Sequence, residues 1–107
     1  MEIPDEIEEE LTERGGLGNL IDKIDEDSIS EQSRIYNALS DEIRLKILTL
    51  LNEQSLCVCL MKKILDIADS KLSYHLSILK DVGLIEGARR ANFVIYEITD
   101  KGRRYLK

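Results

Sequence analysis

The pair Cys57 and Cys59 is the part of this 107-residue sequence best suited to chemistry. A cysteine thiolate is a nucleophile and a soft metal ligand, and two thiolates this close in sequence can share one ligand. Two cysteines one residue apart do not make the disulfide framework of a secreted fold. The pair is therefore a candidate site, and its geometry depends on the elements that hold it.

Those elements are predicted to be a run of helices followed by a hairpin. Ser30 and Ser40 are expected as N-caps of the first two helices, and Cys57 and Cys59 fall at the start of the third. Apolar periodicity predicts helices over 31–39, 41–52, 57–65 and 69–82, and β-branched and aromatic residues predict hairpin strands over 84–90 and 93–98. Thr99 is expected to cap a short last helix over 100–106.

An acidic extension, residues 1–27, precedes the predicted domain at residues 28–107. It is either a flexible tail or a helical arm, and its periodic apolar residues favour the arm, because disordered segments usually lack them. These residues are Ile3, Ile7 and Leu11, then Leu17, Leu20, Ile21 and Ile24. We expect glycines 15, 16 and 18 to end the first helix of this segment.

The net charge of −6 argues against a nucleic-acid partner, but the charge is unevenly distributed. Residues 1–61 hold fifteen acids and five Lys or Arg, a net of −10, whereas residues 62–107 hold six acids and ten Lys or Arg, a net of +4. Any DNA contact is therefore expected in the second half. The sequence has no run of about eighteen apolar residues and no signal peptide, which predicts a cytoplasmic protein without a membrane partner.

The helix at 69–82 and the hairpin after it carry the predicted DNA-binding residues. The leucines at 72, 76 and 79 form one stripe, and the polar side chains lie outside it. A helix anchored in this way can enter the major groove while a hairpin reaches the backbone or minor groove. The candidates are Ser70, Lys71, Ser73, Tyr74, His75 and Ser77 on the helix, and Arg89, Arg90 and Asn92 on the hairpin. The alternative for His75, which lies beside the leucine stripe, is a hydrogen-bonded structural role. The order of elements predicts a winged helix-turn-helix, mainly α with a small β-hairpin (α+β), with an N-terminal helical extension.

The chain resembles the ArsR/SmtB family of metal- and redox-sensing repressors over about residues 36–98. The matching stretches are ALSDEIRLKILTLL (38–51), SLCVCL (55–60) and DSKLSYHLSILKDVGLI (69–85). The resemblance implies a homodimer that binds double-stranded DNA at a two-fold symmetric operator and represses transcription until an inducer arrives.

The resemblance also makes Cys57 and Cys59 a thiolate site for arsenite, antimonite, cadmium or lead. On a regular helix their sulfurs would point about 200° apart, so a chelate would require the helix start to unwind or tilt. Lys62 stands where a third cysteine can occur, and the family's Asp, His and Glu site on the last helix is missing. Three interpretations remain: a site for As(III) or a soft metal with an outside third ligand, a redox switch, or small apolar residues that fill space.

Two other function classes are weighed against a DNA-binding regulator. A winged helix can serve as a protein-interaction or dimerisation module with structural cysteines, and the acidic first half would suit a basic partner. Such a module would place large apolar residues where Ser70, Tyr74, Ser77 and Arg89 stand. An enzyme is not expected, since one histidine and no phosphate-binding loop leave no assembled nucleophile or base. We further hypothesise that the apolar residues at 17, 20, 21 and 24 extend or replace the dimer contact.

Overall fold

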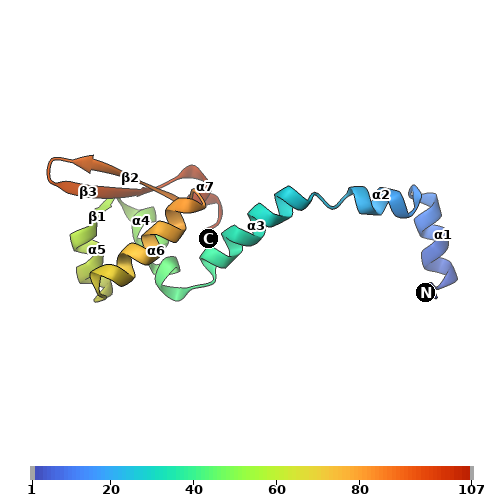
Figure 1. The fold of residues 1–107 in the computed structure, drawn as a ribbon, viewed down its shortest axis with the longest axis horizontal. Coiled ribbons are helices and arrows are strands. Elements are labelled where there is room, and N and C mark those ends of the chain that lie inside the picture. The colour runs from blue at the N-terminus through green and yellow to red at the C-terminus, as the bar shows by residue number, and fades with distance from the viewer. Residues whose placement is uncertain (1, 107) are drawn as a thin grey trace. The chain divides into compact units, whose positions relative to one another are not determined.

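Two chain segments of different character make up the computed structural model, which describes residues 2–106 (Figure 1). The chain divides into a first unit up to Ser33 and a second unit from Arg34 on. The first unit contains α1 (Asp5–Glu13), α2 (Gly16–Asp22) and the beginning of α3 (Glu26–Leu39). No helix within residues 2–106 has the length and apolar character needed to cross a membrane.

The second unit packs helices against a three-stranded antiparallel sheet, in which β3 lies between β1 and β2. Its strands are β1 (Leu56–Cys57), β2 (Ile85–Arg90) and β3 (Phe93–Ile98), and its further helices are α4 (Glu42–Glu53), α5 (Val58–Leu65), α6 (Asp69–Asp81) and α7 (Asp100–Arg104). Strands β2 and β3 form a hairpin that projects beyond the helices at its turn (Figure 1). This arrangement confirms the predicted winged helix-turn-helix. It adds β1, a strand of two residues that apolar periodicity did not indicate.

The core of this unit is built from the apolar stripes of α4 and α6 and the inner residues of the sheet. The buried residues include Ile47, Leu48 and Leu51 of α4, Leu72, Leu76 and Leu79 of α6, and Leu84, Ile85 and Ile98 at the sheet. α7 packs closely on this core, because a Cβ at Gly102 would lie 2.7 Å from Cγ1 of Ile98 and overlap the Leu84 carbonyl. The stripe predicted for α6 therefore does anchor that helix.

The helix ends test the predicted caps. The N-cap of α4 is Asp41, whose carboxylate accepts hydrogen bonds from the N–H groups of Ile43 at 2.8 Å and Arg44 at 3.1 Å. The prediction that Ser40 caps this helix is wrong, because the Ser40 hydroxyl instead donates to the Asn37 carbonyl at the end of α3. The Thr99 cap of α7 is confirmed by a 3.0 Å hydrogen bond from the Gly102 N–H.

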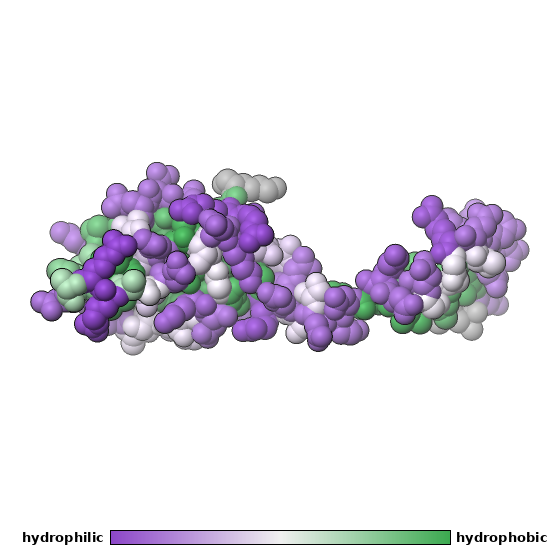
Figure 2. Space-filling view, turned by 90° about the horizontal axis from the view of Figure 1, so that it is seen from above, coloured by the Kyte–Doolittle hydropathy of each residue, from purple (hydrophilic) through white to green (hydrophobic). Residues whose placement is uncertain are grey.

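In the first unit, α1 and α2 are helices, and neither has a buried residue. Gly15 and Gly16 take positive φ angles at the turn between them, but Gly16 and Gly18 lie inside α2 rather than ending a helix. α3 begins at Glu26, before the predicted Ser30, and the Asp25 carboxylate accepts from the Ser28 N–H. The apolar side chains at 17, 20, 21 and 24 are between 53% and 63% exposed, and green surface patches mark this unit at the right of Figure 2.

Candidate functional site

The outer face of α6 carries the polar side chains predicted to contact DNA. Tyr74 is 61% exposed, and the other exposed members are Ser70, Lys71, Ser73 and Ser77. The opposite face holds the buried leucine stripe, so the polar face is fixed to a packed core while its side chains remain accessible. Short hydroxyls and one lysine on such a helix can donate and accept hydrogen bonds at base edges and phosphates.

The hairpin brings a second group of predicted contacts to its turn. Arg89, Arg90 and Asn92 are all exposed. Arg90 pairs in register with Phe93, so Ala91 and Asn92 form a two-residue turn, in which Ala91 has a φ of 55°. Two cations next to a narrow turn can reach phosphates beside a bound helix.

Arg90 is also part of a chain of polar contacts along the sheet. Its Nη2 lies 3.2 Å from Oε1 of Glu97 on β3, and the same carboxylate oxygen accepts a hydrogen bond from the Ser55 hydroxyl at 3.2 Å. Ser55 directly precedes β1. The chain of contacts therefore links a hairpin arginine to the segment that carries the cysteines.

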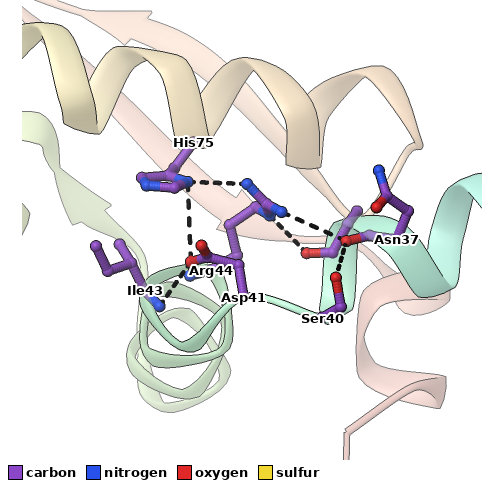
Figure 3. A network of polar contacts seen from close by, with 7 residues as sticks. Asn37, Ser40, Asp41, Ile43, Arg44 and His75 are labelled. Atoms are coloured by element: carbon purple, nitrogen blue, oxygen red, sulfur yellow. Dashed lines mark hydrogen bonds and ion pairs between the residues drawn. The ribbon is translucent and has the colours of Figure 1, made fainter.

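His75, predicted among the DNA contacts, does not lie with the exposed set. Its side chain points inward to α4 and is only 4% exposed (Figure 3). Its Nδ1 lies 3.0 Å from an Nη of Arg44. Burial lowers the pKa of His75; the Asp41 carboxylate opposes this effect, while Arg44 and Lys71 add to it. A buried ring bonded to arginine is unavailable to a base edge.

Arg44 is the residue at this site that sequence reasoning missed. It is 7% exposed, and besides His75 it donates from Nε to the Ala38 carbonyl at 2.6 Å and from Nη2 to the Asn37 carbonyl at 3.4 Å (Figure 3). A signal was present, since Arg44 precedes Ile47 and Leu48 by three and four residues and so falls on the buried stripe of its helix.

The two cysteines lie together at the start of α5. Cys57 ends β1 in an extended conformation, with φ −78° and ψ 157°, and serves as the N-cap of α5, while Cys59 lies in the first turn. Their sulfurs are 2.7 Å apart. The helix predicted to begin near Cys57 begins at Val58 instead, so the sulfurs come together without unwinding or tilting of a helix that includes both cysteines.

The environment of the pair favours ligand chemistry over packing. The two thiols share a hydrogen bond in which either sulfur can be the donor, and this bond lowers the pKa of Cys57 and raises that of Cys59. Cys57 is half-buried and Cys59 is exposed, which does not support the space-filling interpretation. No group of three or more His, Cys, Asp or Glu side chains that could hold a metal ion occurs among residues 2–106. Residues 2–106 therefore offer a soft metal or metalloid two sulfur ligands, those of Cys57 and Cys59.

The pair also belongs to the sheet that carries the hairpin arginines. Cys57 pairs in register with Ile95 of β3, and Ile95 pairs with Ala88 of β2. The residue after Ala88 is Arg89. A displacement of β1 would therefore act on the strand that lies between the cysteines and these arginines.

Comparison with known proteins identifies the family. Residues 41–86 match the family model described as bacterial regulatory protein, arsR family. The arsenical resistance operon repressor of Bacillus subtilis is 32% identical over 82 residues, which cover 76% of this chain and 78% of that protein. The chain belongs to the arsR family. The membership confirms the resemblance seen in the sequence and the prediction of a transcriptional regulator rather than an enzyme.

A second relative and a solved structure extend the comparison. The cadmium resistance transcriptional regulatory protein CadC of Listeria innocua is 39% identical over 67 residues, which cover 62% of this chain and 56% of that protein. Among solved structures, the homodimeric winged helix-turn-helix DNA-binding domain Mb0332 of Mycobacterium bovis superposes with a TM-score of 0.67 at 26% identity. That superposition covers 71% of this chain and 70% of the Mycobacterium domain.

Proposed function

We propose that this arsR-family chain is a cytoplasmic homodimeric repressor that inserts α6 into the major groove of a two-fold symmetric operator. The observation that carries the proposal is the division of α6 into a buried leucine face and an exposed face of hydroxyl, tyrosine and lysine side chains. Arg89, Arg90 and Asn92 at the hairpin turn contact the backbone or minor groove beside it. The homodimeric state of the Mycobacterium domain supports a dimer.

Cys57 and Cys59 are proposed to receive the signal that releases DNA, and As(III) is the preferred inducer. Arsenite, As(OH)3, exchanges two hydroxides for the two sulfurs, and each thiol proton leaves with a hydroxide as water. The third coordination position of the arsenic keeps a hydroxide or takes an external thiol. Two sulfurs 2.7 Å apart suit this exchange, and the relative from Bacillus is named as an arsenical resistance repressor. Cadmium prefers four ligands, and the described residues supply two sulfurs.

The route from the pair to DNA is proposed to run through the sheet. Ligand binding at Cys57 moves β1 against β3, and the Ser55–Glu97–Arg90 contacts carry this movement to the hairpin arginine. A second route leads through α5, because the Lys62 ammonium lies 3.0 Å from the carboxylate of Asp69 at the start of α6. Either movement changes the fit of the DNA-binding surface without a contact between inducer and DNA.

The test is a selection of duplexes from a random pool by the reduced protein, repeated with arsenite, with cadmium and after mild peroxide oxidation. We expect a two-fold symmetric site to be selected and arsenite to release it. Release on oxidation alone would replace the metalloid by a redox signal, in which the two thiols lose two electrons and two protons to peroxide. Selection of no duplex would favour the protein-interaction module instead.

A matched pair of variants tests the role of the cysteines. Cys57→Ser and Cys59→Ser together remove both sulfur ligands while keeping the size of the side chains, and we expect DNA binding without release by arsenite. Ser73→Ala, on the proposed DNA face, should weaken DNA binding but leave arsenite binding to the protein intact. A double cysteine variant that still released DNA on arsenite addition would contradict sensing at the pair.

A further inference from the structure

We infer that Arg44 and His75 act as a positioning pair for DNA recognition: the guanidinium holds the imidazole and thereby fixes where α6 presents its polar face. The inference rests on the proposed DNA binding by α6. Both side chains are buried, Arg44 at 7% and His75 at 4% exposure, so they act through the helix rather than by touching DNA (Figure 3). Each of the two residues contributes a different part of the arrangement.

Arg44 joins three helices through one buried guanidinium. From the first turn of α4 it donates to the carbonyls of Ala38 and Asn37, which lie in the last turn of α3, where carbonyls commonly lack a partner within the helix. The remaining arm donates to Nδ1 of His75 on α6. Arginine presents its N–H donors in a rigid planar fork, so the position of the ring is tied to the end of α3.

The hydrogen bond between Arg44 and His75 restrains the rotation of α6, which apolar packing alone does not do. The stripe of Leu72, Leu76 and Leu79 fastens α6 to the core, but contacts between aliphatic side chains are not directional and tolerate small rotations of the helix. A 3.0 Å hydrogen bond between Arg44 and His75 restrains both distance and angle. The pair therefore sets the rotation of α6 about its own axis.

The restrained ring is adjacent to the proposed DNA contacts. The His75 ring meets the ring of exposed Tyr74 edge-on, with centroids 5.2 Å apart and an interplanar angle of 64°. Lys71 lies one turn earlier on α6, close enough to influence the charge state of His75. A rotation of α6 that followed loss of the Arg44 bond would displace both of these exposed side chains together.

The pair requires a neutral His75. Because an arginine N–H can only donate, Nδ1 must accept, and the ring proton resides on Nε2. The groups that face the ring are Asp41 and Arg44 from α4, with a carboxylate oxygen of Asp41 4.0 Å from Nδ1, and Lys71 from α6 itself; α3 faces the pair with backbone carbonyls. Protonation at Nδ1 would remove the acceptor and bring two cations into contact. Acid should therefore break the pair.

The test compares His75→Asn with His75→Leu in the full chain, using the duplex selected by the wild-type protein as the probe. Asn keeps an acceptor near the position of Nδ1 but does not titrate, whereas Leu removes the acceptor and keeps an apolar bulk. Near neutral pH we expect His75→Asn to bind almost as tightly as wild type and His75→Leu to bind about tenfold more weakly. Affinities are corrected for the folded fraction of each variant.

A pH profile separates positioning from a merely structural role. His75 is the single histidine of the chain, so its ring proton resonance reports its titration without ambiguity. We expect wild-type affinity to fall, relative to His75→Asn, as this resonance titrates below about pH 6.5. Coincident pH profiles of the two proteins would overturn the inference, and this comparison stands even if His75→Leu does not fold.

Ile47→Val controls for loss of stability, because Ile47 is a fully buried core residue of α4. This variant should be less stable and bind the duplex as wild type does. Wild-type affinity of a folded His75→Leu protein would also overturn the positioning role. Failure of the wild-type protein to select any duplex would instead refute the proposed function.

Discussion

Glu97→Gln should strengthen DNA binding, because Glu97 holds the hairpin arginine in the free protein. Arg90 and Glu97 lie 3.2 Å apart with side chains 65% and 44% exposed, and an exposed pair of this kind contributes about 0.2–1 kcal/mol. DNA phosphate must compete with this carboxylate for Arg90. Removing the charge should therefore raise the affinity by up to about fivefold at low salt.

The control for this change is Glu86→Gln, since Glu86 pairs in register with Glu97 on the neighbouring strand and is also exposed. Both variants remove one negative charge from the same sheet, so both reduce general repulsion of DNA by a similar amount. Within residues 2–106, the carboxylate that forms an ion pair with Arg90 is that of Glu97 and not that of Glu86. Fluorescence anisotropy on the selected duplex across a salt series measures both variants, and equal gains for the two would refute the competition argument.

Three further predictions concern stability and assembly. Gly102→Ala should lower the free energy of unfolding by about 1–3 kcal/mol, seen as a lower thermal midpoint, because the added Cβ overlaps backbone atoms. Gly18→Ala, which has open space around it, should not destabilise the protein. Leu20→Glu with Ile21→Glu should lower the dimer fraction in light scattering if these exposed residues extend the dimer contact; an unchanged dimer would contradict that role. Hydrogen bonds to Asp41 lower the pKa of its carboxyl in the folded state. The carboxylate therefore stabilises the fold above the unfolded pKa of about 3.9, and this stabilisation is lost as the pH falls through the folded pKa. The urea midpoint of wild type should exceed that of Asp41→Asn at neutral pH, and the difference should shrink over this acid range.

Much of the fold could be predicted because it depends on local periodicity. The leucine stripe of α6 and the change to strand-like residues after Gly83 place the helix and hairpin within one or two residues of their bounds. The two-residue strand β1 was not predictable in this way, because its identity as a strand comes from pairing with β3, about forty residues further along the chain. Long-range pairing has no local signature.

In the candidate site too, features set by local periodicity could be predicted and long-range contacts could not. The exposed set on α6 follows from the stripe, and the stripe also indicated the burial of His75, which follows Leu72 by three residues and precedes Leu79 by four. Its partner Arg44 lies 31 residues away in sequence, so the hydrogen bond between the two side chains could not be predicted from the sequence. The spacing of Cys57 and Cys59 predicted a shared ligand, but the assumption of a regular helix gave the wrong sulfur geometry.

The preformed thiol pair constrains how an inducer can act. A ligand shifts an equilibrium only by its differential affinity for the two states. If arsenite releases DNA as proposed, the thiol pair that is close in the free protein must be held differently when DNA is bound. By linkage, the selected duplex must weaken arsenite binding by the same factor by which arsenite weakens DNA binding. Titrating arsenite with and without saturating duplex, followed by thiolate-to-arsenic absorption, measures the first factor, and anisotropy measures the second. Arsenite affinity that is unchanged by the duplex would show that the pair binds the metalloid without regulating DNA.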